Sequence, residues 1–243
     1  MIKDFTSGAT AYGKAFSYIS RFGLWGYVLV PGLISLLLGF AIFRSAWALS
    51  GDVGKWLVSW YPFSWGSETL GEVASVFGGI FVLAIGFIIF KHLVMIIASP
   101  FMSFLSEKIE KKIYGGTAKT PTFQMILSDL ARGVQLALRN IFRELLFTLL
   151  LFLAGLIPIF SPFVPFLIFL VQAYYAGFAN MDYTLERYYR VNNSVKFVRQ
   201  NKGLALGNGT VFMLLLFTGI GFLIALPLGT VAATTETLKR IKH

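Results

Sequence analysis

Long stretches without a charged side chain dominate the polarity pattern of this chain. Clusters of charged residues separate four such stretches, at 22–43, 73–90, 145–181 and 203–235. A helix needs about 20 consecutive apolar residues to cross the hydrocarbon core of a bilayer, and the first stretch meets that length. The apolar character of the second continues beyond Lys91 to Leu105. The pattern therefore predicts an all-α integral membrane protein.

The first two stretches predict two long transmembrane helices, over about 22–43 and 70–98. Trp25 lies near one end of the first helix and Trp47 lies beyond the other end, as expected for side chains at the membrane interface. Pro100 should end the second helix, because the residue before a proline disfavours helical geometry. Its roughly 30 residues exceed the thickness of the hydrocarbon core, so this helix must tilt or protrude.

The third and fourth stretches carry helix breakers near their middle and predict two hairpins. Three prolines within 158–165 interrupt the third stretch, and a Gly-Ile-Gly segment at 219–221 interrupts the fourth. Two complete crossings joined by a turn need roughly 40 residues or more, and both stretches are shorter. We therefore expect two partly inserted, re-entrant helical hairpins, at about 123–200 and 203–238, with their apolar turns packed against other helices or subunits.

The distribution of charge indicates how these helices are oriented. The chain has 21 Lys and Arg against 11 Asp and Glu. The loop expected at 45–71 has one Lys and two acidic residues, whereas most basic residues gather in 1–21, 91–143, 187–202 and 239–242. Two crossings followed by two returning hairpins place all four basic segments on one side, which the positive-inside rule identifies as cytoplasmic. The same charge would also attract anionic lipid or an anionic solute.

Several classes of enzyme and metalloprotein are excluded by the residues that are missing. The chain has no cysteine, so disulfides, thiolate catalysis and sulfur-ligated metal centres are ruled out. No phosphate loop, nucleophile elbow or metal motif occurs. Glu107 and Glu110 could act as an acid–base pair, but Lys108, Lys111 and Lys112 surround them, which favours a solvated helix face. We expect no catalytic residue, no metal site and no cofactor.

Two segments combine cations with the start of a helix, which is chemistry suited to anions. Helix N-termini favour negative charge, and arginine binds oxyanions in a bidentate manner. The alternative for the first segment is a snorkelling interfacial arginine beside glycines that serve helix packing. The second segment follows Ser194, a predicted N-cap, and its alternative is a basic patch at the membrane surface. The first candidate site comprises Arg21, Phe22, Gly23, Leu24, Trp25 and Gly26, and the second comprises Lys196, Arg199 and Lys202.

Short motifs spread along nearly the whole chain add a family resemblance. They are Phe5-Thr6-Ser7, the segment from Gly23 to Pro31, Ser99-Pro100-Phe101 with Leu105, Glu107 and Glu110, Thr120-Pro121, Asp182-Tyr183, Gly209 and Pro227. In their order and spacing they resemble the CysZ-type sulfate permeases, small proteins of the bacterial inner membrane. The resemblance implies two spanning helices, two partly inserted hairpins, oligomers, and passage of sulfate without ATP hydrolysis or a cofactor.

One departure from that family concerns the anion site. The resemblance implies a pair of sulfate-binding arginines two residues after the glycine that matches Gly23. This chain has Trp25 and Gly26 at those two positions, and Arg21 lies roughly one helical turn earlier. We therefore expect a divergent member, with a site formed by Arg21 and the adjoining backbone.

Two functions from different classes follow. The leading one is a sulfate or related oxyanion channel or permease, a multi-pass protein of the inner membrane that supplies sulfate for cysteine biosynthesis. The alternative is a non-transporting membrane scaffold. The expected partners are a small oxyanion, membrane lipid and further copies of the chain, and no nucleic acid. Small residues at 203 and 207, and at 74 and 78, offer faces for helix association. The whole chain, 1–243, is expected to form one domain.

Overall fold

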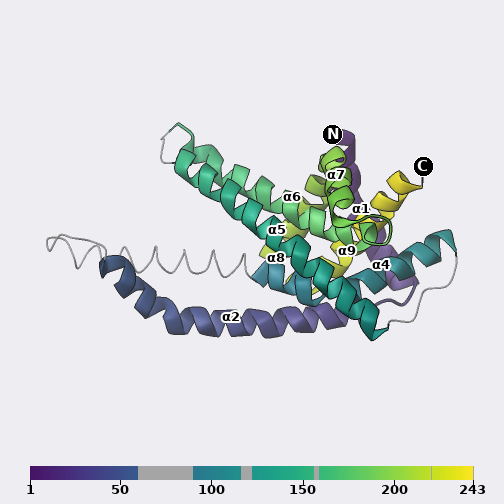
Figure 1. The fold of residues 1–243 in the computed structure, drawn as a ribbon, viewed down its shortest axis with the longest axis horizontal. Helices are drawn as coiled ribbons and strands as arrows, with labels where there is room; N and C mark the ends of the chain where they lie inside the picture. Colours follow the sequence, from purple (N-terminus) through teal and green to yellow (C-terminus); the bar gives the residue numbers. More distant parts are fainter. Residues whose placement is uncertain (60–89, 116–121, 156–158, 220, 243) are drawn as a thin grey trace. The chain divides into compact units, whose positions relative to one another are not determined.

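The computed structural model describes residues 1–59, 90–115, 122–155, 159–219 and 221–242. These residues are helical, with short turns and no strand. The helices are α1 (Ile2–Arg21), α2 (Gly26–Ser59), α4 (Ser99–Tyr114), α5 (Phe123–Gly155), the 3₁₀ helix η1 (Ser161–Phe163), α6 (Val164–Leu185), α7 (Val191–Gln200), α8 (Lys202–Phe217) and α9 (Phe222–Ile241) (Figure 1). The predicted all-α fold is confirmed.

The chain forms two compact units. The first comprises Met1–Leu33 and Met95–His243, and the second comprises Ile34–Val94. Because α2 begins in the first unit and continues into the second, the division runs through a helix. The candidate sites lie in the first unit.

The first predicted span is confirmed as a helix that is long and apolar enough to cross a membrane, over Gly26–Arg44. This helix continues to Ser59, so the first part of the predicted 45–71 loop is helical. Most of the second predicted span, 70–98, lies outside the described residues. Its final segment is a helix that ends at Ile97, where the chain bends by 59°. Pro100 occupies the first turn of the next helix, α4. The preceding helix therefore ends before Pro100, as predicted.

Both predicted hairpins form as pairs of helices. In the first, α5 and α6 contact each other and lie side by side (Figure 1), and Pro165 occupies the first turn of α6. In the second, Gly219 between α8 and α9 has a φ of +74°, a conformation that glycine adopts without strain. Pro227 lies within α9 and does not interrupt it. Val164–Leu185 is itself long enough to cross a membrane, so partial insertion stays a prediction.

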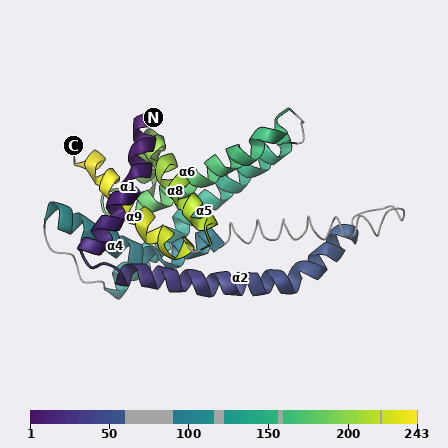
Figure 2. The ribbon, with the colours of Figure 1, turned by 180° about the vertical axis from the view of Figure 1, so that it is seen from behind.

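Glycines in the core of the first unit allow helix backbones to touch. α6 contacts α8, and α1 contacts both α8 and α9 (Figure 2). A Cβ atom added at Gly209 would lie 1.6 Å from the carbonyl oxygen of Ala173, and one at Gly177 would lie 1.9 Å from that of Ala205. Since no side chain fits at such distances, these two glycines set the separation of α6 and α8.

The Gly203–Gly207 pair also serves packing within the chain. A Cβ at Gly207 would lie 2.0 Å from the carbonyl oxygen of Phe5, and one at Gly203 would lie 2.5 Å from that of Met1. The predicted close approach of helices at this face is therefore confirmed, and the helix that approaches is α1 of the same chain. The other predicted small-residue face, at 74 and 78, lies outside the described residues.

Buried amides link four helices of this unit. The Asn180 amide of α6 donates to the side-chain oxygen of Asn208 at 2.8 Å, and the Asn208 amide donates to the Gly229 carbonyl of α9 at 3.0 Å. The hydroxyl of Tyr12, in α1, donates to the Asn208 carbonyl at 2.8 Å. Because such groups have no water to bind in an apolar environment, these bonds hold α1, α6, α8 and α9 in one arrangement.

Candidate functional site

The first candidate site lies in the short connection between α1 and α2. Arg21 is the last residue of α1, with an exposed side chain, and Gly23 has a φ of +66°. The amides of Phe22, Gly23 and Leu24 donate to carbonyls of the last turn of α1, at 3.0, 3.3 and 2.9 Å. These three amides therefore cap α1 and are not available to an anion, contrary to the expectation that Gly23 opens the next helix.

At the start of α2, the backbone amides of Trp25 and Gly26 have no partner within the helix. Neither donates a hydrogen bond to a described residue, whereas the amides that follow them bond back to Leu24 and Trp25. Both residues are exposed. The N-terminus of α2 thus keeps two donors and the positive end of the helix dipole for a ligand.

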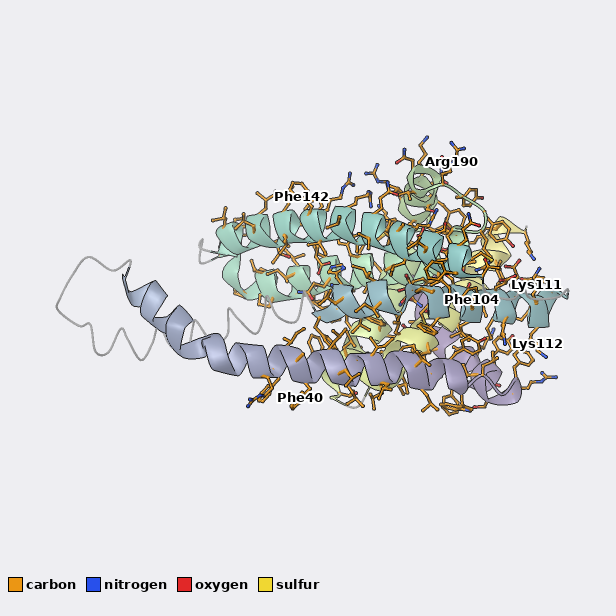
Figure 3. The ribbon with its side chains drawn as sticks, turned by 60° about the horizontal axis from the view of Figure 1, so that its bottom comes forward. Phe40, Phe104, Lys111, Lys112, Phe142 and Arg190 are labelled. Atoms are coloured by element: carbon orange, nitrogen blue, oxygen red, sulfur yellow. The ribbon has the colours of Figure 1, made fainter. Side chains whose placement is uncertain are left out.

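Two lysines of α4 accompany Arg21 near this helix start. The Lys108 Nζ lies 4.9 Å from the centre of the Tyr27 ring, and the Lys112 Nζ lies 5.9 Å from the centre of the Phe22 ring. The Arg21 guanidinium lies 6.0 Å from the same Phe22 ring. Figure 3 shows Lys112 and Phe104 on α4. We name Arg21, Lys108 and Lys112 the α2-start cluster.

None of these three cations forms an ion pair with a described residue. Sequence reasoning assigned Arg21 to the site and missed the two lysines. Their four-residue spacing indicates that they share one helix face, but no pattern in the sequence says which segment that face meets. The structure therefore places three positively charged side chains near the start of α2.

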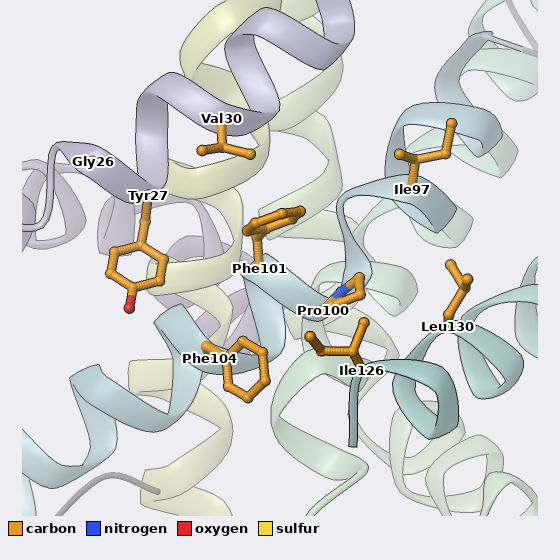
Figure 4. Close-up of a pocket in the computed structure, with 9 residues that line it drawn as sticks. All are labelled: Gly26, Tyr27, Val30, Ile97, Pro100, Phe101, Phe104, Ile126 and Leu130. Atoms are coloured by element: carbon orange, nitrogen blue, oxygen red, sulfur yellow. The ribbon is translucent and has the colours of Figure 1, made fainter. Parts of the chain in front are cut away.

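An apolar pocket borders the α2-start cluster. It has a volume of about 560 Å³ and is lined by Gly26, Tyr27, Val30, Ile97, Pro100, Phe101, Phe104, Ile126 and Leu130 (Figure 4). An unpaired anion is very costly in such surroundings. A sulfate ion would thus be held by the amides and cations beside the pocket and not within it.

The second candidate site is only partly assembled. Ser194 is buried inside α7, which Arg190 precedes as N-cap, so the predicted N-cap role of Ser194 is wrong. Arg199 and Lys202 line one pocket of about 440 Å³. Lys196 is exposed on α7 and does not line that pocket. The structure therefore brings together two of the three predicted residues.

Two arginines of α5 add to the second site. Burial and the positive charges of Arg143 and Arg199 lower the pKa of the Arg139 guanidinium, so these three cations lie near one another. The spacing of Arg139 and Arg143 predicts a shared helix face. It does not predict that α7 brings Arg199 to that face.

Buried ion pairs elsewhere in the first unit are already satisfied. The Arg132 Nε donates to Asp182 at 3.0 Å and its Nη2 donates to the other Asp182 oxygen at 2.9 Å. Arg132 also donates to the Tyr189 carbonyl and to the Ser194 hydroxyl, at 2.9 Å each. Burial and the charge of Asp182 raise the pKa of the neighbouring Glu186 to about 8.

Glu110 belongs to a second buried group. Its carboxylate lies 3.0 Å from Arg187 and 3.1 Å from Lys242, and it accepts a hydrogen bond from the Tyr188 hydroxyl. Burial alone would raise the pKa of Glu110, but these partners hold it below its usual range. Glu110 and Glu107 are both buried, so the interpretation of a solvated helix face is wrong.

Three of the residues that carry the family resemblance, Asp182, Tyr183 and Gly209, have structural roles that the contacts explain, and Thr120 and Pro121 lie outside the described residues. Asp182 pairs with Arg132, and the neighbouring Tyr183 hydroxyl donates to the Met95 carbonyl at 2.9 Å. Gly209 permits the contact with Ala173. In this chain these residues therefore serve helix packing and buried pairing.

Comparison with known proteins agrees with the resemblance. The family described as “Sulfate transporter CysZ/Etoposide-induced protein 2.4” matches residues 11–227. A protein named “Sulfate transporter CysZ” from Vibrio parahaemolyticus serotype O3:K6 (strain RIMD 2210633) is 27% identical over 225 residues, which cover 89% of this chain and 88% of that relative. The chain therefore belongs to the Sulfate transporter CysZ/Etoposide-induced protein 2.4 family.

Proposed function

We propose that this protein transports sulfate or a closely related oxyanion across the bacterial inner membrane, as a channel or permease that supplies sulfate for cysteine biosynthesis. The observation that carries the proposal is the α2-start cluster, whose three cations form no ion pair with a described residue and lie near the amides of Trp25 and Gly26. The family and the name of the relative support sulfate as the solute.

The α2-start cluster suits an oxyanion with two charges. The amides of Trp25 and Gly26 would donate to its oxygens, and the dipole of α2 would add favourable potential. Arg21 would approach from α1, and Lys108 and Lys112 would approach from α4. In this chain the lysines would supply the positive charge that the family resemblance implies for the positions of Trp25 and Gly26.

Passage without a driving ion fits the sequence of the apolar stretches. The stretches at 22–43, 73–90, 145–181 and 203–235 contain no Asp, Glu, Lys or Arg. Proton relays and cation sites in membrane proteins use such residues. We infer uncoupled movement of the anion, and we expect assembly into a homo-oligomer to cover the apolar turns of the two hairpins.

Calorimetric titration with sulfate tests the site. Arg21→Ala should lower affinity by about one to two powers of ten, because a hydrogen bond to a charged group is worth roughly 1.5–3 kcal/mol. Arg21→Lys should restore only part of it, since an ammonium group lacks the bidentate fork. Lys108→Gln should also weaken binding. Lys14→Ala is the matched control, because Lys14 is an exposed cation on the same helix as Arg21.

The outcomes separate the site from the function. Unchanged affinity in both Arg21→Ala and Lys108→Gln would exclude the α2-start cluster, and an equal loss in Lys14→Ala would indicate diffuse attraction. Arginine placed at Trp25 or Gly26 should strengthen binding. If the parent protein binds sulfate but does not admit it to proteoliposomes, the scaffold function replaces transport.

A further inference from the structure

The pocket of about 440 Å³ that Arg199 and Lys202 border has a lining that is mainly apolar. Its apolar lining comes mainly from Phe147 and Leu151 of α5, Leu167 and Leu170 of α6, and Leu206 of α8. The volume lies within the roughly 300–1,000 Å³ of ordinary ligand sites. We name it the α5–α6 pocket.

Polarity changes along the α5–α6 pocket in one direction. On α6 the lining passes from Leu167 to Tyr174 and Tyr175, and on α5 it passes from Leu151 back to Phe147. Because α5 and α6 form a hairpin, the earlier residues of α5 lie toward the same end as the tyrosines, and Arg143 is one helical turn before Phe147. The pocket is therefore apolar toward the hairpin turn and cationic at its other end.

The cationic end carries an excess of positive charge. Arg139, Arg143, Arg199 and Lys202 form no ion pair with a described residue, and the first three act electrostatically on Tyr174. Among the described charges near the adjacent Tyr175 is also one buried carboxylate, that of Glu144. Because these four cations have no ion-pair partner among the described residues, this end of the pocket has an excess of positive charge.

We propose that the α5–α6 pocket binds an anionic phospholipid. One acyl chain lies among Leu151, Leu167 and Leu170, and the phosphate accepts hydrogen bonds from Arg199 and Lys202. A free oxyanion would use the cations alone and leave the apolar part of the pocket empty, whereas a phospholipid matches both parts. Arg199 and Lys202, which the sequence placed in a second oxyanion site, would then bind lipid. This proposal does not depend on the proposed transport of sulfate.

The test is native mass spectrometry of the full chain, with phosphatidylglycerol or phosphatidylcholine of the same acyl chains added to the detergent. The protein should bind phosphatidylglycerol in preference to phosphatidylcholine. The double change Arg199→Gln with Lys202→Gln should weaken phosphatidylglycerol binding by roughly thirtyfold, as expected for two cations at an anionic headgroup. Lys196→Gln, on the same helix as Arg199 but outside the pocket, should leave binding unchanged.

A second variant tests the acyl-chain part. Leu170→Trp fills the pocket and keeps every cation, so it should reduce phosphatidylglycerol binding while circular dichroism shows an unchanged helix content. The proposal is overturned if both lipids bind equally, or if Lys196→Gln weakens binding as much as the double change. It is also overturned if Leu170→Trp has no effect and inorganic phosphate or sulfate displaces the lipid, since a soluble anion would then be the ligand.

Discussion

Removing Arg132 should destabilise the protein more than removing any exposed arginine. The Arg132 guanidinium makes two hydrogen bonds to Asp182, at 3.0 and 2.9 Å, and the two side chains are only 16% and 6% exposed. It also bonds to the Tyr189 carbonyl and the Ser194 hydroxyl. Arg132→Met would leave the Asp182 carboxylate buried without its partner.

The expected loss is about 3–5 kcal/mol of unfolding free energy, the usual cost of breaking a buried ion pair by removing one partner. The double variant Arg132→Met with Asp182→Leu should lose markedly less, because no buried charge then remains unpaired. Arg190→Met is the matched control. Arg190 is exposed (Figure 3), and surface changes of this kind usually alter stability by less than about 0.5 kcal/mol.

The assay is unfolding in mixed micelles at increasing fractions of sodium dodecyl sulfate, followed by circular dichroism. The free energies of the parent, both single variants and the double variant give the coupling between Arg132 and Asp182. A loss below about 1 kcal/mol in Arg132→Met, typical of exposed pairs, would refute the reasoning. The reasoning would also be refuted if the double variant lost as much unfolding free energy as the two single variants together.

Three further predictions concern packing, pH and topology. Gly209→Ala should strongly lower the unfolding temperature, because its Cβ would lie 1.6 Å from a carbonyl oxygen, whereas Gly13→Ala, with open space around it, should not. Since the folded-state pKa of Glu186 is raised to about 8, the folded state binds more protons than the unfolded state between about pH 4.5 and pH 8, so stability should fall as pH rises through this window. Glu186→Gln should abolish that fall in thermal unfolding, and an equally steep fall in the variant would contradict the assignment. Single cysteines at Lys111 and Lys239 should react with an impermeant maleimide from the same side of the membrane, and labelling from opposite sides would disprove the topology.

Helix boundaries could be predicted from sequence where they depend on local chemistry. Pro100 predicts a helix end just before it, and the chain bends at Ala98, although Ser99, which directly precedes the proline, already belongs to α4. Gly219 takes a positive φ, and the fourth apolar stretch turns there as expected. Pro227, further along the same stretch, lies inside α9 and does not end it.

Partners across the fold could not be predicted, because they depend on how helices face each other. Glu110 lies in a lysine-rich segment, yet it meets Arg187 and Lys242, and the sequence does not show that these segments converge. Gly207 was correctly identified as a close-packing residue. Its neighbour is α1 of the same chain, whereas the sequence pattern would equally fit a second copy.

The candidate anion site shows the same limit. Arg21 could be found because it stands beside the predicted first span, and its position in the sequence determines that it lies near Trp25. Lys108 and Lys112 are more than 80 residues away along the chain. Only the folded arrangement of α4 beside the start of α2 brings them to Tyr27 and Phe22.

Uptake of radiolabelled sulfate into proteoliposomes containing the purified protein tests the central claim most directly. The proposed function predicts uptake that exceeds that of protein-free vesicles, needs no ATP or imposed ion gradient, and falls in Arg21→Ala but not in Lys14→Ala. Vesicles that carry the folded parent protein yet take up sulfate no faster than empty ones would contradict it.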